Sequence, residues 1–313
     1  MFPTLMTFSQ EHGLSLGYAP VGDGVIGIHT YGLMIMLAFL AAFVTTSNRA
    51  PRVGIEADGL VPFYLIACVS GLLGSRLLHF VFAEPALFFS NPLVFFDFGQ
   101  GGFAFLGGLL GGVAAGVAYA IWRGISVWKL ADLVAPAIML AAAVGRGGCF
   151  FAGCCHGGAI PEAEVVSTLL SLPGGSVVTI DTAPFISLVF TQGVGVGAIH
   201  DAPLYPTQLW EITSGLTLFA FLSWMWAKAR RFDGQIMAAM LVCYAPIRIV
   251  NEMFRGDAVR GVDKFGTGLS TSQLVSLSLV LMALGIILYR LPRGRDPETP
   301  IVYDDDGDFE EVG

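Results

Sequence analysis

The chain alternates between long apolar runs and short polar connections. A helix of about 20 apolar residues is long enough to cross the hydrocarbon core of a bilayer. Runs of that kind occur at residues 28–46, 60–82, 103–122, 131–151, 207–227, 235–254 and 271–290. The pattern therefore predicts an all-α polytopic membrane protein with about seven transmembrane helices, occupying residues 28–290.

The two ends of the chain differ from this pattern. Residues 1–27 have scattered apolar positions and no basic start, which favours an external interfacial segment over a cleavable signal peptide. Residues 291–313 are strongly acidic, and we expect them to form a disordered cytoplasmic tail.

A long connection, residues 157–205, separates the fourth and fifth predicted spans. It contains strand-like patches at 164–172, 176–180 and 185–190, separated by glycine and proline. We therefore expect an external loop subdomain at this point of the chain.

Lysine and arginine are distributed unevenly between the loops. The loops after the second, fourth and sixth spans hold only Arg255, Arg260 and Lys264, and the fourth-span loop, residues 157–205, holds none. Because basic loops stay in the cytoplasm, we expect an external N-terminus and a cytoplasmic C-terminus. The loops after the first, third, fifth and seventh spans hold Arg49, Arg52, Arg123, Lys129, Lys228, Arg230, Arg231, Arg290, Arg293 and Arg295.

The composition agrees with a membrane protein. Hydrophobic residues make up 55% of the 313 positions and charged residues 13%, whereas soluble domains carry about 25% charged residues. The net charge of −8 arises largely from acidic residues beyond position 255. Nothing in this distribution indicates nucleic-acid binding.

The stretch Val144–Gly158, VGRGGCFFAGCCHGG, combines polar groups and glycines at the end of an apolar run. An arginine at membrane depth is costly, so it normally has a partner or a function. We therefore take Arg146 as the first candidate site residue.

The same stretch holds Cys149, Cys154, Cys155 and His156. Small packing residues are the favoured interpretation, and we expect neither a metal nor another cofactor. Two alternatives stay open. One is a disulfide from Cys149 to Cys154 or Cys155, and the other is a soft-metal site, against which the adjacent cysteines argue.

The sixth predicted span carries polar residues in register. Tyr244, Arg248, Glu252 and Arg255 are spaced by four, four and three residues, which places them on one helix face. Such a face is expected to line a cavity, although Arg248 and Glu252 also have the spacing to neutralise each other. With Arg146 on another span, the arginines favour an anion site, and the abundant anion of a bilayer is a lipid phosphate.

Other polar and small residues have competing interpretations. Gly107 and Gly108 fit either close helix packing or backbone exposed to a ligand. Arg76, near the outer end of the second span, is expected to extend to the interface. Gln208 and Glu211 share a face at the start of the fifth span.

Six motifs follow one another in the order HTYGLMIMLAFLAAF, GSRLLHFVF, GGFAFLGGLLGG, DLVAPAIMLAAAVGRGGCF, YPTQLWE and YAPIRIVNEMFRGD. Through these motifs, from about His29 to Tyr289, the chain resembles the bacterial prolipoprotein diacylglyceryl transferase family. That resemblance implies transfer of the diacylglyceryl group of phosphatidylglycerol to the lipobox cysteine of an exported prolipoprotein, next to its signal peptide, in the bacterial cytoplasmic (inner) membrane.

Site residues follow from the resemblance position by position. Arg146 and Gly157 match the arginine and the final glycine of the family signature, and Tyr31 matches the tyrosine of the first span. Arg248, Glu252 and Arg255 match the Arg–Glu–Arg face of the sixth span. We expect Arg146 and Arg248 to bind phosphate, Glu252 to orient Arg248, and Tyr31 to form a hydrogen bond with lipid or substrate. The further expected substrate contacts are Gly107, Gly108, Arg255, Gln208, Cys149 and Cys154.

The chain also departs from the family pattern. Leu106 stands where members have histidine or tyrosine, and Cys149 and Cys154 stand where the signature has asparagine and glutamate. A proposed base is therefore missing, so His156, Glu252 or a lowered thiol pKa would replace it. These departures leave two alternatives open, a phospholipid-dependent transferase with another acceptor and a non-catalytic lipid-binding protein. The oligomeric state is left open.

Overall fold

The structure is a computed structural model. It describes residues 4–9, 13–16, 25–55, 57–97, 102–152, 154–160, 166–171, 177–182, 204–255 and 270–294. The chain forms two compact units. One comprises residues 1–42 and 134–294, and the other comprises residues 43–133 and 295–313. Helices α1 and α5 contribute residues to both units.

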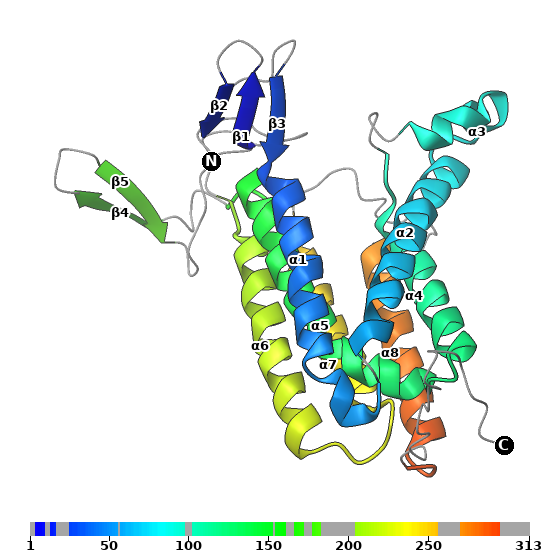
Figure 1. Cartoon of the computed structure of the whole chain (residues 1–313). Helices are drawn as coiled ribbons and strands as arrows, with labels where there is room; N and C mark the ends of the chain where they lie inside the picture. Colours follow the sequence, from blue (N-terminus) through cyan, green and yellow to red (C-terminus); the bar gives the residue numbers. More distant parts are fainter. Residues whose placement is uncertain are drawn as a thin grey trace. The chain divides into compact units, whose positions relative to one another are not determined.

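Each predicted span corresponds to one long helix (Figure 1). Six of these helices are long and apolar enough to cross a membrane, which confirms the polytopic helical fold. The exception is α6, whose first turns carry polar residues, so its crossing stays a prediction. The long helices are α1 (Thr30–Ser47), α2 (Ala57–Phe82), α4 (Phe105–Trp122), α5 (Val127–Ala152), α6 (Thr207–Lys228), α7 (Gln235–Phe254) and α8 (Thr271–Arg290).

Short helices join the long ones within the second unit. Helix α3 (Pro85–Ser90) and the 3-10 turn η2 (Pro92–Phe96) follow α2, and each begins with a proline, which suits the first helical turn. The 3-10 turn η1 (Ala50–Val53) follows α1 and ends at Gly54, whose φ of 73° is left-handed.

Strands occur in two places. β1 (Thr4–Ser9) pairs antiparallel with β2 (Gly13–Leu16) and β3 (Val25–His29), and β3 leads directly into α1. The sequence had suggested an interfacial segment there and did not predict these strands.

The second set of strands lies in the connection between α5 and α6. β4 (Val166–Ser171) and β5 (Val177–Thr182) form an antiparallel hairpin with Val166 opposite Thr182. This hairpin confirms the first two strand-like patches of the sequence. The third, 185–190, lies outside the described residues.

Glycines bring α2 and α4 into close contact. A Cβ atom at Gly107 would lie 2.2 Å from the carbonyl oxygen of Gly74, and one at Gly74 would lie 2.5 Å from the carbonyl oxygen of Gly107. Gly108 similarly faces the carbonyl of Gly71 at 3.3 Å. The packing interpretation of these glycines is therefore the one that the structure supports.

Arg76 does not extend to an interface, contrary to the sequence-based expectation. Only 2% of it is exposed. Its guanidinium donates to the carbonyl oxygens of Val94 and Gly102 at 3.1 and 3.2 Å, and it lies 4.8 Å from the ring centre of Phe80. It is buried because the carbonyls of the turn after α3 accept its hydrogen bonds.

In the first unit, α5 packs between α1 and α6. A Cβ atom at Gly148 of α5 would lie 3.1 Å from Met34 of α1, and one at Gly215 of α6 would lie 3.1 Å from Ala143 of α5. Helix α7 packs against α6 and α8. Small residues thus allow α5 to approach its two neighbours closely.

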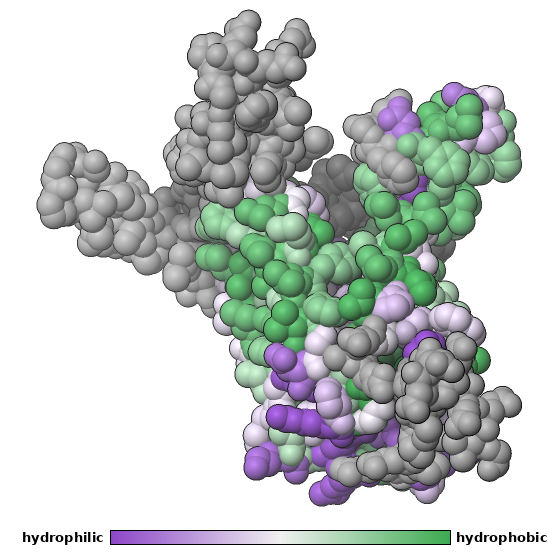
Figure 2. Space-filling model, viewed as in Figure 1, coloured by the Kyte–Doolittle hydropathy of each residue, from purple (hydrophilic) through white to green (hydrophobic). Residues whose placement is uncertain are grey.

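Much of the helix surface is apolar, as a lipid-facing surface requires. On α1, Met36 and Leu40 are more than half exposed, as is Leu281 on α8. Figure 2 shows hydrophobic residues covering the helices, with hydrophilic residues gathered near the C-terminal end of α6.

Candidate active site

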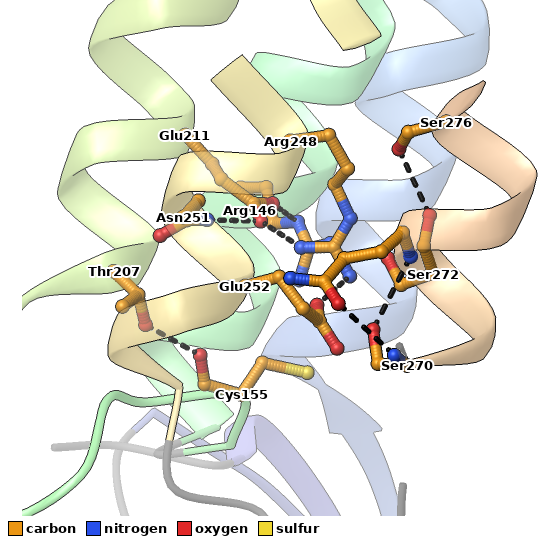
Figure 3. Close-up of polar contacts among 11 residues, drawn as sticks. Arg146, Cys155, Thr207, Glu211, Arg248, Asn251, Glu252, Ser270, Ser272 and Ser276 are labelled. Carbon is orange, nitrogen blue, oxygen red and sulfur yellow. Dashed lines mark hydrogen bonds and ion pairs between the residues drawn. The ribbon is translucent and has the colours of Figure 1, made fainter. Parts of the chain in front are cut away.

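Glu211 is the centre of a charged cluster inside the first unit. It lies one turn into α6, and its carboxylate pairs with the Nε atom of Arg146 on α5. Its other oxygen lies 2.9 Å from a terminal nitrogen of Arg248 on α7. One carboxylate therefore links two arginines from different helices (Figure 3).

Two residues of α7 complete this cluster. Arg248 also pairs with Glu252, one turn further along, with 2.8 Å between nitrogen and oxygen. The amide of Asn251 donates to Glu211. Each of Glu211 and Arg248 is thus held by more than one partner, which fixes the side-chain rotamers.

The cluster is buried and its charges are balanced. The side chains of Glu211 and Glu252 are 10% and 5% exposed, and that of Arg248 is 16% exposed. Two arginines oppose two carboxylates, which reduces the cost of placing each charge away from water. At 23% exposed, Arg146 is the most accessible of the four, so an anion can approach it.

The C-terminal end of α5 gathers three thiols. The amide of Cys154 donates to the carbonyl of Cys149 at 3.0 Å, which turns the chain back over the helix end. Cys155 adopts a left-handed φ of 59°, which is uncommon for a residue with a side chain. The three sulfur atoms lie within 4.8 Å of one another, and the three cysteines are free thiols.

This turn is anchored to α6. The hydroxyl of Thr207 donates to the carbonyl of Cys155 at 3.0 Å, and the amide of Gln208 donates to the carbonyl of Cys154 at 2.9 Å. Both anchoring residues are 1% exposed. The first turn of α6 thus positions the thiol turn and, through Glu211, the arginines.

The residues after the thiols join three helix ends. The amides of Gly157 and Gly158 donate to the carbonyls of Tyr205 and Phe254, each at 2.9 Å. A Cβ atom at Gly157 would lie 2.5 Å from the carbonyl oxygen of Tyr205, so only glycine fits. Arg255 pairs with Gly157 through its backbone. It therefore lies just beyond α7 and is not part of the helical face on which it was predicted.

His156 is buried next to this junction. It is 6% exposed, and its Nδ1 atom donates to the carbonyl of Gly157 at 2.8 Å. Because a carbonyl only accepts hydrogen bonds, the proton is on Nδ1. Its role as a base stays a prediction.

The three thiols influence one another's protonation. Hydrogen bonds with Cys149 and Cys154, aided by the positive charges of Arg146 and Arg255, hold the pKa of Cys155 well below its ordinary value. The hydrogen bond with Cys149 raises the pKa of Cys154.

Tyr31 lies at the start of α1 beside this end of α5. Its ring packs on Gly148, where a Cβ atom would lie 3.2 Å from the ring. It is 45% exposed and within electrostatic range of Arg146 and Cys149. A half-exposed phenol at this position is accessible to a ligand.

The structure thus brings most of the predicted site residues into one unit. Gly107 and Gly108 belong to the other unit, where they pack against α2. The sequence-based prediction missed Glu211 and Asn251 as members of the charged cluster. A signal was present for Glu211, because a carboxylate in a predicted span needs a cationic partner.

Comparison with known proteins assigns the family. Residues 22–289 match the model of the family described as prolipoprotein diacylglyceryl transferase. The chain belongs to this family. Members of the family are multi-pass membrane proteins, in agreement with the apolar helices described above.

Relatives within the prolipoprotein diacylglyceryl transferase family cover nearly the whole chain. The phosphatidylglycerol–prolipoprotein diacylglyceryl transferase of Clostridium tetani is 30% identical over 86% of this chain and 94% of its own length. A second such transferase from Clostridium perfringens is 31% identical over 84% and 91% of the two chains. That of Bordetella parapertussis is 30% identical over 85% and 92%.

Proposed function

We propose that this protein transfers the diacylglyceryl group of phosphatidylglycerol to the lipobox cysteine of a prolipoprotein, beside its signal peptide. The names of its relatives and the family match support this reaction. The observation that carries the proposal is the pair of arginines, Arg146 and Arg248, joined through Glu211 in a buried cluster. Such a cluster fits an anionic lipid headgroup.

The chemistry needs a stabilised leaving group. The acceptor sulfur attacks the carbon of the diacylglyceryl group that carries the phosphate ester oxygen. A carbon–sulfur bond forms at this carbon, and its bond to that oxygen breaks. Glycerol phosphate leaves with the bonding electrons and the thiol proton is released. In this proposal Arg146 and Arg248 stabilise the negative charge that develops on the leaving phosphate, in a site of low dielectric.

Two buried amide oxygens provide hydrogen-bond acceptors for the rest of the headgroup. The side-chain oxygens of Gln208 and Asn251 are buried and have no hydrogen-bond partner among the described residues. A buried acceptor without a partner is costly, so it favours a ligand that brings a donor. The hydroxyl groups of a glycerol headgroup are such donors.

The site and the basic residues together support a location for the reaction. The charged cluster and the thiol turn lie toward the end of α5 that leads to β4 and β5, which the distribution of basic residues assigns to the outside. We therefore place the reaction at the outer face of the bacterial cytoplasmic membrane, where an exported prolipoprotein is accessible.

The test is transfer by the purified protein in phosphatidylglycerol vesicles. A lipobox peptide should gain the mass of a diacylglyceryl group. Arg146→Ala and Arg248→Ala should each lower the rate by about a hundredfold, the usual effect of removing a group that stabilises transition-state charge. Arg293→Ala serves as the control, because Arg293 is an exposed arginine at the end of α8.

The outcomes separate the reaction from the site. A peptide that gains no mass with the wild-type protein contradicts the proposed reaction and favours another acceptor. Full activity in both arginine variants contradicts the site and leaves the reaction standing.

A further inference from the structure

The three thiols at the end of α5 are a second chemical feature of the first unit. Their sulfur atoms lie within 4.8 Å of one another. In a tetrahedral zinc–thiolate site, the metal–sulfur distance of about 2.3 Å places neighbouring sulfurs about 3.8 Å apart. A contraction of the turn by about an ångström would therefore bring all three sulfurs to bonding distance of one ion.

The turn that presents these thiols is held in an unfavourable conformation. A residue other than glycine in the left-handed region costs about 1 kcal/mol or more, and Cys155 adopts that conformation. The buried side chains of Thr207 and Gln208 hold the turn by its carbonyls. The strained turn and the gathered sulfur atoms thus occur at the same place.

Adjacent cysteines had argued against a metal site in the sequence. The structure removes that objection, because the sulfur atoms of the adjacent Cys154 and Cys155 lie within 4.8 Å of each other and of the Cys149 sulfur. The cluster also has cationic neighbours, since Arg146 and Arg255 both interact electrostatically with Cys155. Three thiolates around a divalent ion leave one negative charge, which these arginines offset.

We infer that Cys149, Cys154 and Cys155 bind a thiophilic divalent cation of the zinc class, with a fourth coordination position for the acceptor thiol. Among the described residues, these three cysteines each offer one sulfur atom as a ligand at this place. A zinc site with three protein ligands keeps its fourth position for water or substrate. The second half of this inference rests on the proposed transferase function.

Coordination would supply the nucleophile. A thiol bound to such a cation loses its proton, so the acceptor sulfur is held as a thiolate. That sulfur then forms the carbon–sulfur bond to the glyceryl carbon, the carbon–oxygen bond breaks, and glycerol phosphate leaves. The thiol proton passes to solvent. No oxidant or reductant is consumed. Arg146 interacts with both the thiols and Glu211, so it links the proposed metal site to the charged cluster.

Cobalt(II) is a suitable probe, because thiolate coordination gives it intense absorption bands. The purified full-length protein, reduced and freed of metal, should bind about one cobalt ion per chain with these bands, as expected for a single tetrahedral site. Each of Cys149→Ser, Cys154→Ser and Cys155→Ser should weaken binding at least about tenfold. Cys68→Ser and Cys243→Ser are the controls, since both residues lie on other helices.

A positioning variant separates coordination from folding. Thr207→Val keeps all three sulfurs but removes the hydroxyl that holds the carbonyl of Cys155. It should weaken cobalt binding about tenfold, as loss of a residue that orients a ligand does, while the metal-free variant still unfolds in a single cooperative transition, which shows that the protein is folded.

The acceptor position is tested on the same cobalt protein. A lipobox peptide should shift the thiolate–cobalt bands, and the same peptide with serine in place of cysteine should not. Absence of thiolate bands in the wild-type protein overturns the metal site, as does a disulfide among the three cysteines after anaerobic purification.

The two proposals fail in different ways. Diacylglyceryl transfer by a protein that binds no cobalt overturns the metal inference and leaves the proposed function intact. If the thiolate–cobalt bands do not shift when the lipobox peptide is added, the proposed acceptor position is wrong. Cobalt binding without any transfer in the zinc-loaded protein supports the metal site and counts against the proposed function.

Discussion

At the scale of single residues, Glu211 determines the geometry of the candidate site. It pairs with Arg146 and Arg248 and accepts a hydrogen bond from Asn251. Those partners come from two other helices, so one side chain fixes three elements together. Removing one member of a buried ion pair is more costly than replacing both members with apolar residues, because the remaining buried charge has no counter-charge.

We therefore expect Glu211→Gln to destabilise the protein and abolish transfer. Arg146 would then lose the carboxylate with which it pairs, and Arg248 would keep Glu252. The cost of an uncompensated buried charge is about 3 kcal/mol. The melting temperature in detergent and the transfer rate would measure both effects. The matched control is Glu84→Gln, at an exposed carboxylate before α3. An unchanged melting temperature would show that Glu211 does not hold the cluster.

At the scale of elements, glycine positions set how closely helices pack. Gly74 and Gly107 allow α2 and α4 to approach until backbone meets backbone. Gly112, also on α4, is different, because its nearest neighbour is a carbonyl oxygen at an ordinary 3.7 Å. Glycines of one helix thus differ in what a methyl group would meet.

This difference gives a matched pair of substitutions. Gly74→Ala should destabilise the protein by about 2 kcal/mol, because its methyl group would meet the backbone of α4, which cannot move aside without separating the helices. Gly112→Ala should be neutral or stabilise by up to about 1 kcal/mol, since alanine favours the helix. Thermal unfolding in detergent measures both. Equal effects would mean that the contact between α2 and α4 is looser than the structure shows.

At the scale of the whole molecule, the orientation in the membrane decides which side the site faces. Basic residues cluster in the loop between α6 and α7, where Arg230 pairs with Asp233. The hairpin of β4 and β5 lies in a connection without lysine or arginine. The positive-inside rule predicts that the loop between α6 and α7 lies in the cytoplasm and that the hairpin lies outside.

Reporter fusions would test this orientation. A phosphatase that is active only after export should be active when fused after Thr182 and inactive when fused after Lys228. The reason is that only the first fusion point lies on the side without basic residues. The opposite pattern would place the thiols and arginines in the cytoplasm, where an exported prolipoprotein is out of reach.

The sequence by itself determined the long helices and one contact of the site. Apolar runs of spanning length identify helices because hydrophobicity and length are properties of each segment alone. The pairing of Arg248 with Glu252 was also predictable, since residues four apart on a helix are neighbours by geometry. The strands β1 to β3 lacked a comparable local pattern and were missed.

Only the tertiary structure decided which distant groups meet. Glu211 and Arg248 are separated by 37 positions, and their contact depends on how α6 packs against α7. Arg76 is buried because carbonyls beyond α3 accept its hydrogen bonds, and no local sequence pattern predicted this contact. The three sulfurs converge because Thr207 and Gln208, more than 50 residues away, hold the turn in place. Local periodicity specifies helices, whereas a polar partner is chosen by packing among elements that are far apart in the chain.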